Sequence, residues 1–122
     1  KLNTEFKFDA AHFIDGYDGK CGRMHGHTYR VRMSAVSEKL NPSAYLKTPD
    51  MVCDFRELKW AAKDAPKGGL DHAVLNEVIP VPTTAECIAQ YIHRETMKRL
   101  PEGIELTVTL WETADSWVEY SE

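Results

Sequence analysis

The sequence predicts an α+β domain in which two helices pack on one face of an antiparallel four-stranded sheet, in the order ββααββ. Two observations lead to this prediction. Apolar and polar residues alternate in two stretches near each end of the chain, and the middle of the chain holds two capped helical patterns. Neighbouring strands joined by turns pair antiparallel, and helices between them can cover one face of the sheet.

The first two strands are expected over residues 2–12 and 27–36. In the first, apolar side chains such as Phe8 alternate with charged ones, and in the second, Tyr29 begins a similar alternation. The stretch 15–22 between them is rich in Gly and Asp, which predicts a loop.

The two helices are expected after clear start signals. Asp54 and Glu57 have the spacing of a capping box, and the helix that they begin should end at Pro66. Thr83 and Glu86 repeat this spacing at the start of the second helix.

The C-terminal part of the chain predicts two further strands, over residues 105–113 and 117–120. No repeat or linker divides the chain, and 122 residues suit one domain, so we expect a single domain over 1–122.

The composition is that of an ordinary globular protein, with 43% apolar and 28% charged residues. The formal net charge of −4 is unlike a basic nucleic-acid footprint, and the apolar runs are too short to span a bilayer. Cys21, Cys53 and Cys87 are odd in number and widely spaced, which argues against a disulfide framework. We therefore expect a cytoplasmic protein without a nucleic-acid or membrane partner.

Three histidines form a candidate metal site. His25 and His27 are two residues apart on one strand, so their side chains share a face and lie about 6.6 Å apart along it. His12 ends the first strand and comes near them if the two strands form a hairpin. Three histidines without a fourth protein ligand are typical of catalytic zinc, whereas the alternative is three histidines that bind no metal. His93, beside Arg94 on the second helix, is expected to be solvated.

Other polar residues are candidates for the chemistry. Cys21 lies in a loop beside Lys20 and Arg23, and nearby cations make a thiol a better base; the alternative is an ordinary loop thiol. The pair Asp71-His72 lies between the helices, where a carboxylate can orient an imidazole for proton transfer, although a local turn role is the simpler interpretation.

Glu112 lies on the core-facing side of its expected strand, with Leu110. A carboxylate on that side is costly unless it is paired, which suggests that it receives polar groups of a ligand. The alternative is a change of register at the strand end that turns Glu112 to solvent.

Together these segments resemble the 6-pyruvoyl-tetrahydropterin synthase family, and most closely its 6-carboxytetrahydropterin synthase branch of queuosine biosynthesis. The resemblance covers almost the whole chain. It is carried by Phe8–His12, Cys21–His27, Met51–Phe55, Leu70–His72, Leu75-Asn76, Pro82–Glu86, Trp111–Thr113 and Trp117. The three-residue gap between Cys21 and His25 resembles the carboxy-forming branch.

The resemblance implies a lyase that uses zinc to convert 7,8-dihydroneopterin triphosphate into 6-carboxy-5,6,7,8-tetrahydropterin, with release of acetaldehyde and triphosphate. It implies a tunnelling fold, in which subunits join their sheets into a barrel, and a homohexamer of two stacked trimers with active sites at subunit interfaces. The implied roles are zinc binding by His12, His25 and His27, proton transfer by Cys21, Asp71 and His72, and pterin binding by Glu112, Thr83 and Thr84.

Three other functions are compatible with the same residues. A 6-pyruvoyl-tetrahydropterin synthase would use the same site but keep the full side chain of the substrate. A zinc-dependent aldolase would act on dihydroneopterin itself and release no triphosphate. A non-catalytic zinc-binding assembly module would keep the three histidines but would have no use for Cys21, Asp71-His72 and Glu112 together.

Overall fold

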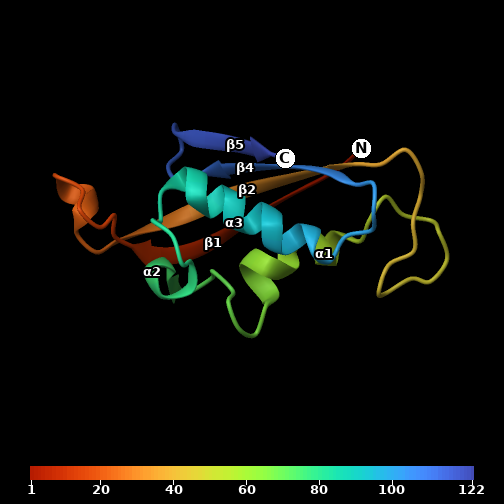
Figure 1. Ribbon diagram of the computed structural model, residues 1–122, viewed down its shortest axis with the longest axis horizontal. Helices are drawn as coiled ribbons and strands as arrows, with labels where there is room; N and C mark the ends of the chain where they lie inside the picture. Colours follow the sequence, from red (N-terminus) through yellow and green to blue (C-terminus); the bar gives the residue numbers. More distant parts are fainter.

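A computed structural model describes residues 1–122 and contains one five-stranded sheet with the strand order β3-β1-β2-β4-β5 (Figure 1). The strands are β1 (Leu2–His12), β2 (His25–Val36), β3 (Ala73–Val74), β4 (Glu105–Trp111) and β5 (Trp117–Ser121). β1, β2, β4 and β5 pair antiparallel along this order, whereas β3 runs parallel to β1. Two long loops extend from opposite ends of the sheet.

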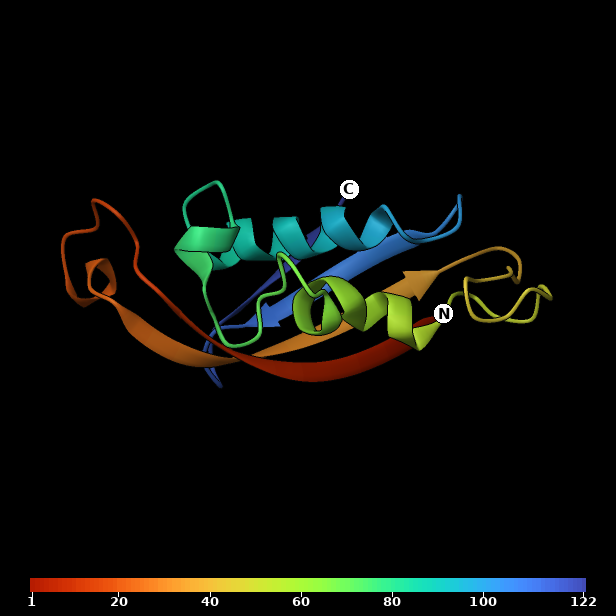
Figure 2. The ribbon, with the colours of Figure 1, turned by 90° about the horizontal axis from the view of Figure 1, so that it is seen from below.

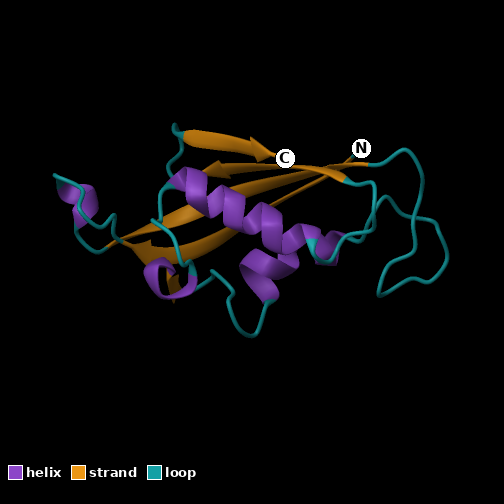
Figure 3. Cartoon of the chain, viewed as in Figure 1, coloured by secondary structure: helices purple, strands orange, loops and turns teal.

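The main helices lie on one face of the sheet, as Figure 2 shows from the side and Figure 3 by element type. They are α1 (Phe55–Lys59), its π-helical continuation η2 (Trp60–Asp64), α2 (Leu75–Val78) and α3 (Ala85–Met97). A short 3-10 turn, η1 (Lys20–Gly22), lies apart from them in the loop between β1 and β2. No helix is long and apolar enough to cross a membrane.

The core lies between the sheet and these helices, and it follows the predicted alternation. Phe8 and Tyr29 are buried on the inner face and stack with ring centroids 4.9 Å apart. Ile88 and Ile92 of α3 are also fully buried in this core. Burial of this apolar surface stabilises the layered arrangement that the sequence predicts.

The prediction of a four-stranded, purely antiparallel sheet is wrong in one respect. β3 is a fifth strand, and its two residues pair in parallel with Ala10 and Ala11 at the edge of the sheet. A two-residue strand carries no alternation that a sequence pattern could reveal. β3 matters for the site because it directly follows His72.

The expected capping boxes are also wrong in detail. Asp54 does cap α1 by accepting from the backbone N–H of Arg56 at 2.9 Å, but Glu57 turns its carboxylate to the Arg99 guanidinium. The residue that caps α3 is Thr84, which accepts from the N–H of Cys87, so the start of α3 is one residue later than predicted.

His93 is buried rather than solvated. Its exposed fraction is 4%, and its Nε2 lies 3.0 Å from the backbone oxygen of Leu106. The adjacent Arg94 is exposed, which shows that neighbouring residues on a helix can face opposite environments.

Candidate metal centre and active site

The β1–β2 hairpin brings the three candidate metal ligands together. In the antiparallel register His12 lies opposite His25, and Ala10 lies opposite His27, so all three imidazoles project from one face. Their ring centroids are 4.6–5.2 Å apart. One ring nitrogen from each lies within 4.8 Å of the other two, which is close enough for a single ion to contact all three.

Hydrogen bonds to the backbone orient two of these imidazoles. Nδ1 of His12 lies 2.9 Å from the carbonyl oxygen of Thr83, and Nδ1 of His25 lies 2.6 Å from that of Arg23. A carbonyl can only accept, so each Nδ1 carries the proton and each Nε2 keeps its lone pair. This is the tautomer in which metal-binding histidines are usually held.

Two of the three histidines, His12 and His27, offer buried nitrogen atoms that are suited to a metal ion. Nε2 of His12 and Nε2 of His27 are buried and have no hydrogen-bond partner. Burial lowers the pKa of both imidazoles, although the carboxylate of Glu112 partly opposes this. Neutral imidazoles with free lone pairs suit zinc, and three of them leave a coordination position for a substrate.

The Glu112 side chain faces this cluster and not the solvent. Its carboxylate oxygens lie 4.0 Å from Nε2 of His12 and 3.9 Å from Nε2 of His27, and the side chain is 27% exposed. The register of β2 with β4 ends at Arg30 opposite Trp111, so Glu112 comes next to Tyr29. The carboxylate is therefore within reach of a ligand bound at the histidines.

Tyr29, which was expected only as an apolar residue of its strand, is also a neighbour of the histidine cluster. Its ring lies 5.4 Å from that of His27, and its buried hydroxyl has no hydrogen-bond partner. Burial, assisted by the Glu112 charge, raises the pKa of Tyr29, so the hydroxyl stays protonated. Its position two residues after His27, on the same face, was the available signal.

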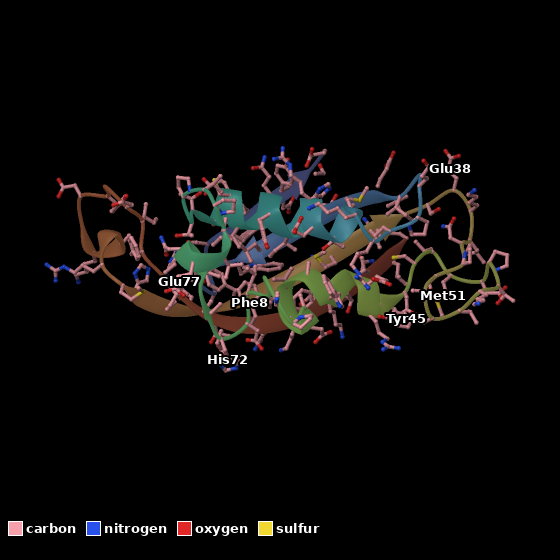
Figure 4. All side chains as sticks on the ribbon, turned by 60° about the horizontal axis from the view of Figure 1, so that its bottom comes forward. Phe8, Glu38, Tyr45, Met51, His72 and Glu77 are labelled. Atoms are coloured by element: carbon pink, nitrogen blue, oxygen red, sulfur yellow. The ribbon has the colours of Figure 1, made fainter.

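The Asp71-His72 pair is attached to β1 through Asp9. The backbone N–H of Asp9 donates to Oδ1 of Asp71 at 3.0 Å, and the N–H of His72 donates to the carbonyl of Asp9 at 2.6 Å. Nε2 of His72 lies 3.8 Å from Oδ1 of Asp71, in an irregular backbone where His72 has a φ of 60°. The His72 side chain is 80% exposed and points away from the body of the protein (Figure 4).

Cys21 lies in η1, within the loop beyond the end of the sheet. It is half-buried, and its carbonyl accepts from the N–H of Ile14 at 2.8 Å. No hydrogen bond or ion pair joins Cys21 to Asp71 or His72. The three residues predicted to transfer protons therefore form two separate groups within one chain.

Thr83 and Thr84, the two predicted pterin-binding threonines, both have partners inside the protein. Thr83 is fully buried, and its hydroxyl donates to the carbonyl of Phe13 at 3.0 Å. Thr84 is half-buried and caps α3.

Two surface hollows differ in how they suit an anionic substrate. One of about 370 Å³ is lined by residues 9–11, 26–27 and 72–74, so it joins His27 of the cluster to His72. Another, of about 580 Å³, lies near Glu38 at the other end of the sheet (Figure 4), and its charged lining residues are Glu38, Glu102, Glu105 and Lys39. Its acidic walls would repel a phosphate chain.

The whole chain, residues 1–122, matches the family described as 6-pyruvoyl tetrahydropterin synthase. The chain belongs to this family. It is 35% identical over 146 aligned positions to the 6-carboxy-5,6,7,8-tetrahydropterin synthase of Haemophilus influenzae, with 100% of this chain and 99% of the relative covered. It is 34% identical to the protein of the same name from Synechocystis, with 98% and 91% covered. The predicted family is thereby confirmed.

Other family members show that the similarity extends beyond this branch. The human 6-pyruvoyl tetrahydrobiopterin synthase is 32% identical, with 84% of this chain and 70% of the relative covered. The 6-pyruvoyl tetrahydropterin synthase structure from Caenorhabditis elegans superposes with a TM-score of 0.74 at 22% identity, covering 99% of this chain and 94% of that one. That structural likeness supports the family fold.

Proposed function

We propose that this protein is a zinc-dependent lyase that converts 7,8-dihydroneopterin triphosphate and one water molecule into 6-carboxy-5,6,7,8-tetrahydropterin, acetaldehyde and triphosphate. The observation that carries the proposal is the convergence of three imidazoles beside a carboxylate. His12, His25 and His27 would hold the metal, and Glu112 would receive the pterin. The carboxy product is preferred because the two relatives described first carry that name.

Bound zinc would supply Lewis-acid polarisation of the substrate's side-chain oxygens. The residues of the chain would handle the protons. Cys21, as a thiolate, would remove a proton from the substrate side chain, and His72, oriented by Asp71, would return one elsewhere on the substrate. Because the ring and the side chain exchange oxidation level internally, no redox cofactor is required.

The separation of Cys21 from Asp71 and His72 within one chain supports an active site shared between subunits. We propose a homohexamer of two stacked trimers with a tunnelling fold. β3 and β5 are the edge strands of the sheet, and strand edges offer backbone groups to which another copy can add. Trp117 of β5, 55% exposed, would be covered by such a contact.

The pterin would lie against Glu112, with Thr83 and Thr84 lining its pocket. Since each threonine hydroxyl already has a partner, their contacts would come mainly through the backbone. The triphosphate would meet Lys20 and Arg23, which are exposed on either side of Cys21. A local positive patch of this kind attracts a polyanion in spite of the net negative charge.

The proposal is tested by incubating the zinc-loaded protein with 7,8-dihydroneopterin triphosphate and identifying the products by mass spectrometry, with acetaldehyde assayed in parallel. Carboxytetrahydropterin with acetaldehyde is the expected result. A pyruvoyl product without acetaldehyde would assign the protein to the pyruvoyl synthases of its family. No turnover by fully metallated protein would overturn the proposal and favour a zinc-binding assembly module.

A further inference from the structure

The tautomer of His12 is fixed by Thr83 through two contacts. Nδ1 of His12 lies 2.9 Å from the carbonyl oxygen of Thr83 and 3.3 Å from its hydroxyl oxygen. The hydroxyl proton is already donated to the carbonyl of Phe13, so the hydroxyl oxygen faces the imidazole as an acceptor. Both atoms near Nδ1 therefore accept, and the imidazole must present its Nε2 lone pair to the other histidines.

The end of β1 needs support at this point because the sheet stops there. His12 opposite His25 is the last pair of the β1–β2 register. Phe13, the next residue, has no strand partner for its backbone, and a strand end of this kind is prone to fraying. Any movement of Phe13 would displace the imidazole that precedes it.

Asn76 replaces the missing strand partner. Its Oδ1 accepts from the N–H of Phe13 at 3.0 Å, and its Nδ2 donates to the carbonyl of Phe13 at 2.8 Å. A carboxamide has the same donor and acceptor as a peptide group, so it pairs with both backbone groups of Phe13 at once. The carbonyl of Phe13 is shared with the Thr83 hydroxyl, which joins Asn76, Phe13, Thr83 and His12 in one network.

We propose that Asn76 and Thr83 are positioning residues of the metal centre, which hold the His12 imidazole with its Nε2 toward the other two histidines. The inference rests on the proposed metal site. It assigns a role to Asn76, which the proposed chemistry does not use, and gives Thr83 a role toward His12 in addition to any toward the pterin. Partners of this kind around metal ligands typically alter metal affinity by about 10- to 100-fold when they are removed.

The test compares the zinc affinity of the whole protein and its variants by competition with a chromogenic chelator. Asn76→Ala and Thr83→Val are each expected to bind zinc at least about tenfold more weakly than wild type. Thr83→Ser keeps the hydroxyl and should bind zinc like wild type. Asn41→Ala is the matched control. Asn41 is also buried and its side chain also donates to backbone carbonyls, those of Lys39 and Val52, but it lies in the loop between β2 and α1.

A second measurement separates positioning from general loss of structure. In the metal-free protein, nitrogen NMR should show His12 protonated at Nδ1, with slow exchange of that proton in wild type and Thr83→Ser. Exchange of the Nδ1 proton should be faster in Thr83→Val and Asn76→Ala, because the residues that shield Nδ1 from water are held less firmly. If Asn76→Ala does not fold, the comparison of Thr83→Val with Thr83→Ser still tests the positioning role.

The outcomes separate the inference from the function on which it rests. If wild type binds no zinc, or retains full affinity when all three histidines are replaced, the proposed metal site itself fails. If wild type binds one zinc per chain and both Asn76→Ala and Thr83→Val match it, the positioning role is wrong while the proposed function stands.

Discussion

The Oε1 atom of Glu112 lies 3.9 Å from Nε2 of His27, which places a carboxylate directly beside the candidate metal ligands. The two residues come from different strands, since His27 is in β2 and Glu112 follows the end of β4. A substrate that reaches the histidines must therefore also approach this carboxylate.

Replacing Glu112 by alanine should weaken pterin binding about 10- to 100-fold, because hydrogen bonds to a charged group contribute about 1.5–3 kcal/mol. The measurement is a fluorescence titration of the zinc-loaded protein with a pterin. Glu119→Ala, which removes an exposed carboxylate of β5, is the control and should bind normally. Unchanged affinity in Glu112→Ala would remove this residue from the pocket.

Replacing Cys21 by alanine should leave zinc binding intact and lower turnover by about 10²- to 10⁴-fold, which is the usual contribution of a positioned acid or base. Zinc content and rate are measured on the same preparation. Cys87→Ala removes a half-buried thiol on α3 and should keep the full rate. Full activity in Cys21→Ala would show that another group is the base.

The sequence predicted the parts of this fold that depend on regular alternation. The β1–β2 hairpin could be predicted because His25, His27 and Tyr29 occupy every second position and so share one face of the sheet. For Glu112 the same alternation left two orientations open, and the structure has the one that faces inward, toward the histidines. The convergence of the three histidines follows directly from that hairpin.

The features that could not be predicted depend on contacts between distant segments. β3 has two residues and α2 has four, which is too short for any periodic signal. The contact between Asn76 and Phe13 joins residues 63 positions apart, and burial of His93 depends on how α3 lies on β4. Thr83 lies one residue before Thr84, the residue that caps α3, and only the backbone geometry shows which of the two threonines is the cap.

His72 offers a test that separates backbone strain from chemistry. It is the only non-glycine residue with a positive φ, a conformation that costs a residue with a side chain about 1–2 kcal/mol. His72→Gly and His72→Ala both remove the imidazole, so both should lose turnover. The glycine variant should nevertheless be more stable than the alanine variant by about 1 kcal/mol in urea unfolding. Equal stability would show that the positive φ relaxes without cost.

The pH dependence of the metal-free protein should report on the buried histidines. Burial lowers the pKa of His12 and His27 below the ordinary value of about 6.5 that applies in the unfolded chain. At a pH between that value and the lower pKa of the folded protein, these two histidines are protonated in the unfolded chain but neutral in the folded protein. The free energy of unfolding should therefore fall as the pH drops below about 6.5, and these two groups should have no effect at higher pH.

The slope of the free energy of unfolding against pH shows which histidines cause the loss of stability. Each histidine that stays neutral in the folded state can contribute up to about 1.4 kcal/mol per pH unit, measured by urea unfolding between about pH 6.5 and 5. His27→Gln should reduce the slope, because it removes one of the two imidazoles whose pKa is lowered by burial. Added zinc should raise stability and steepen the fall, since protons then compete with the metal for the same nitrogen atoms. A slope that is unchanged in His27→Gln would show that this imidazole is protonated as readily in the folded protein as in the unfolded chain.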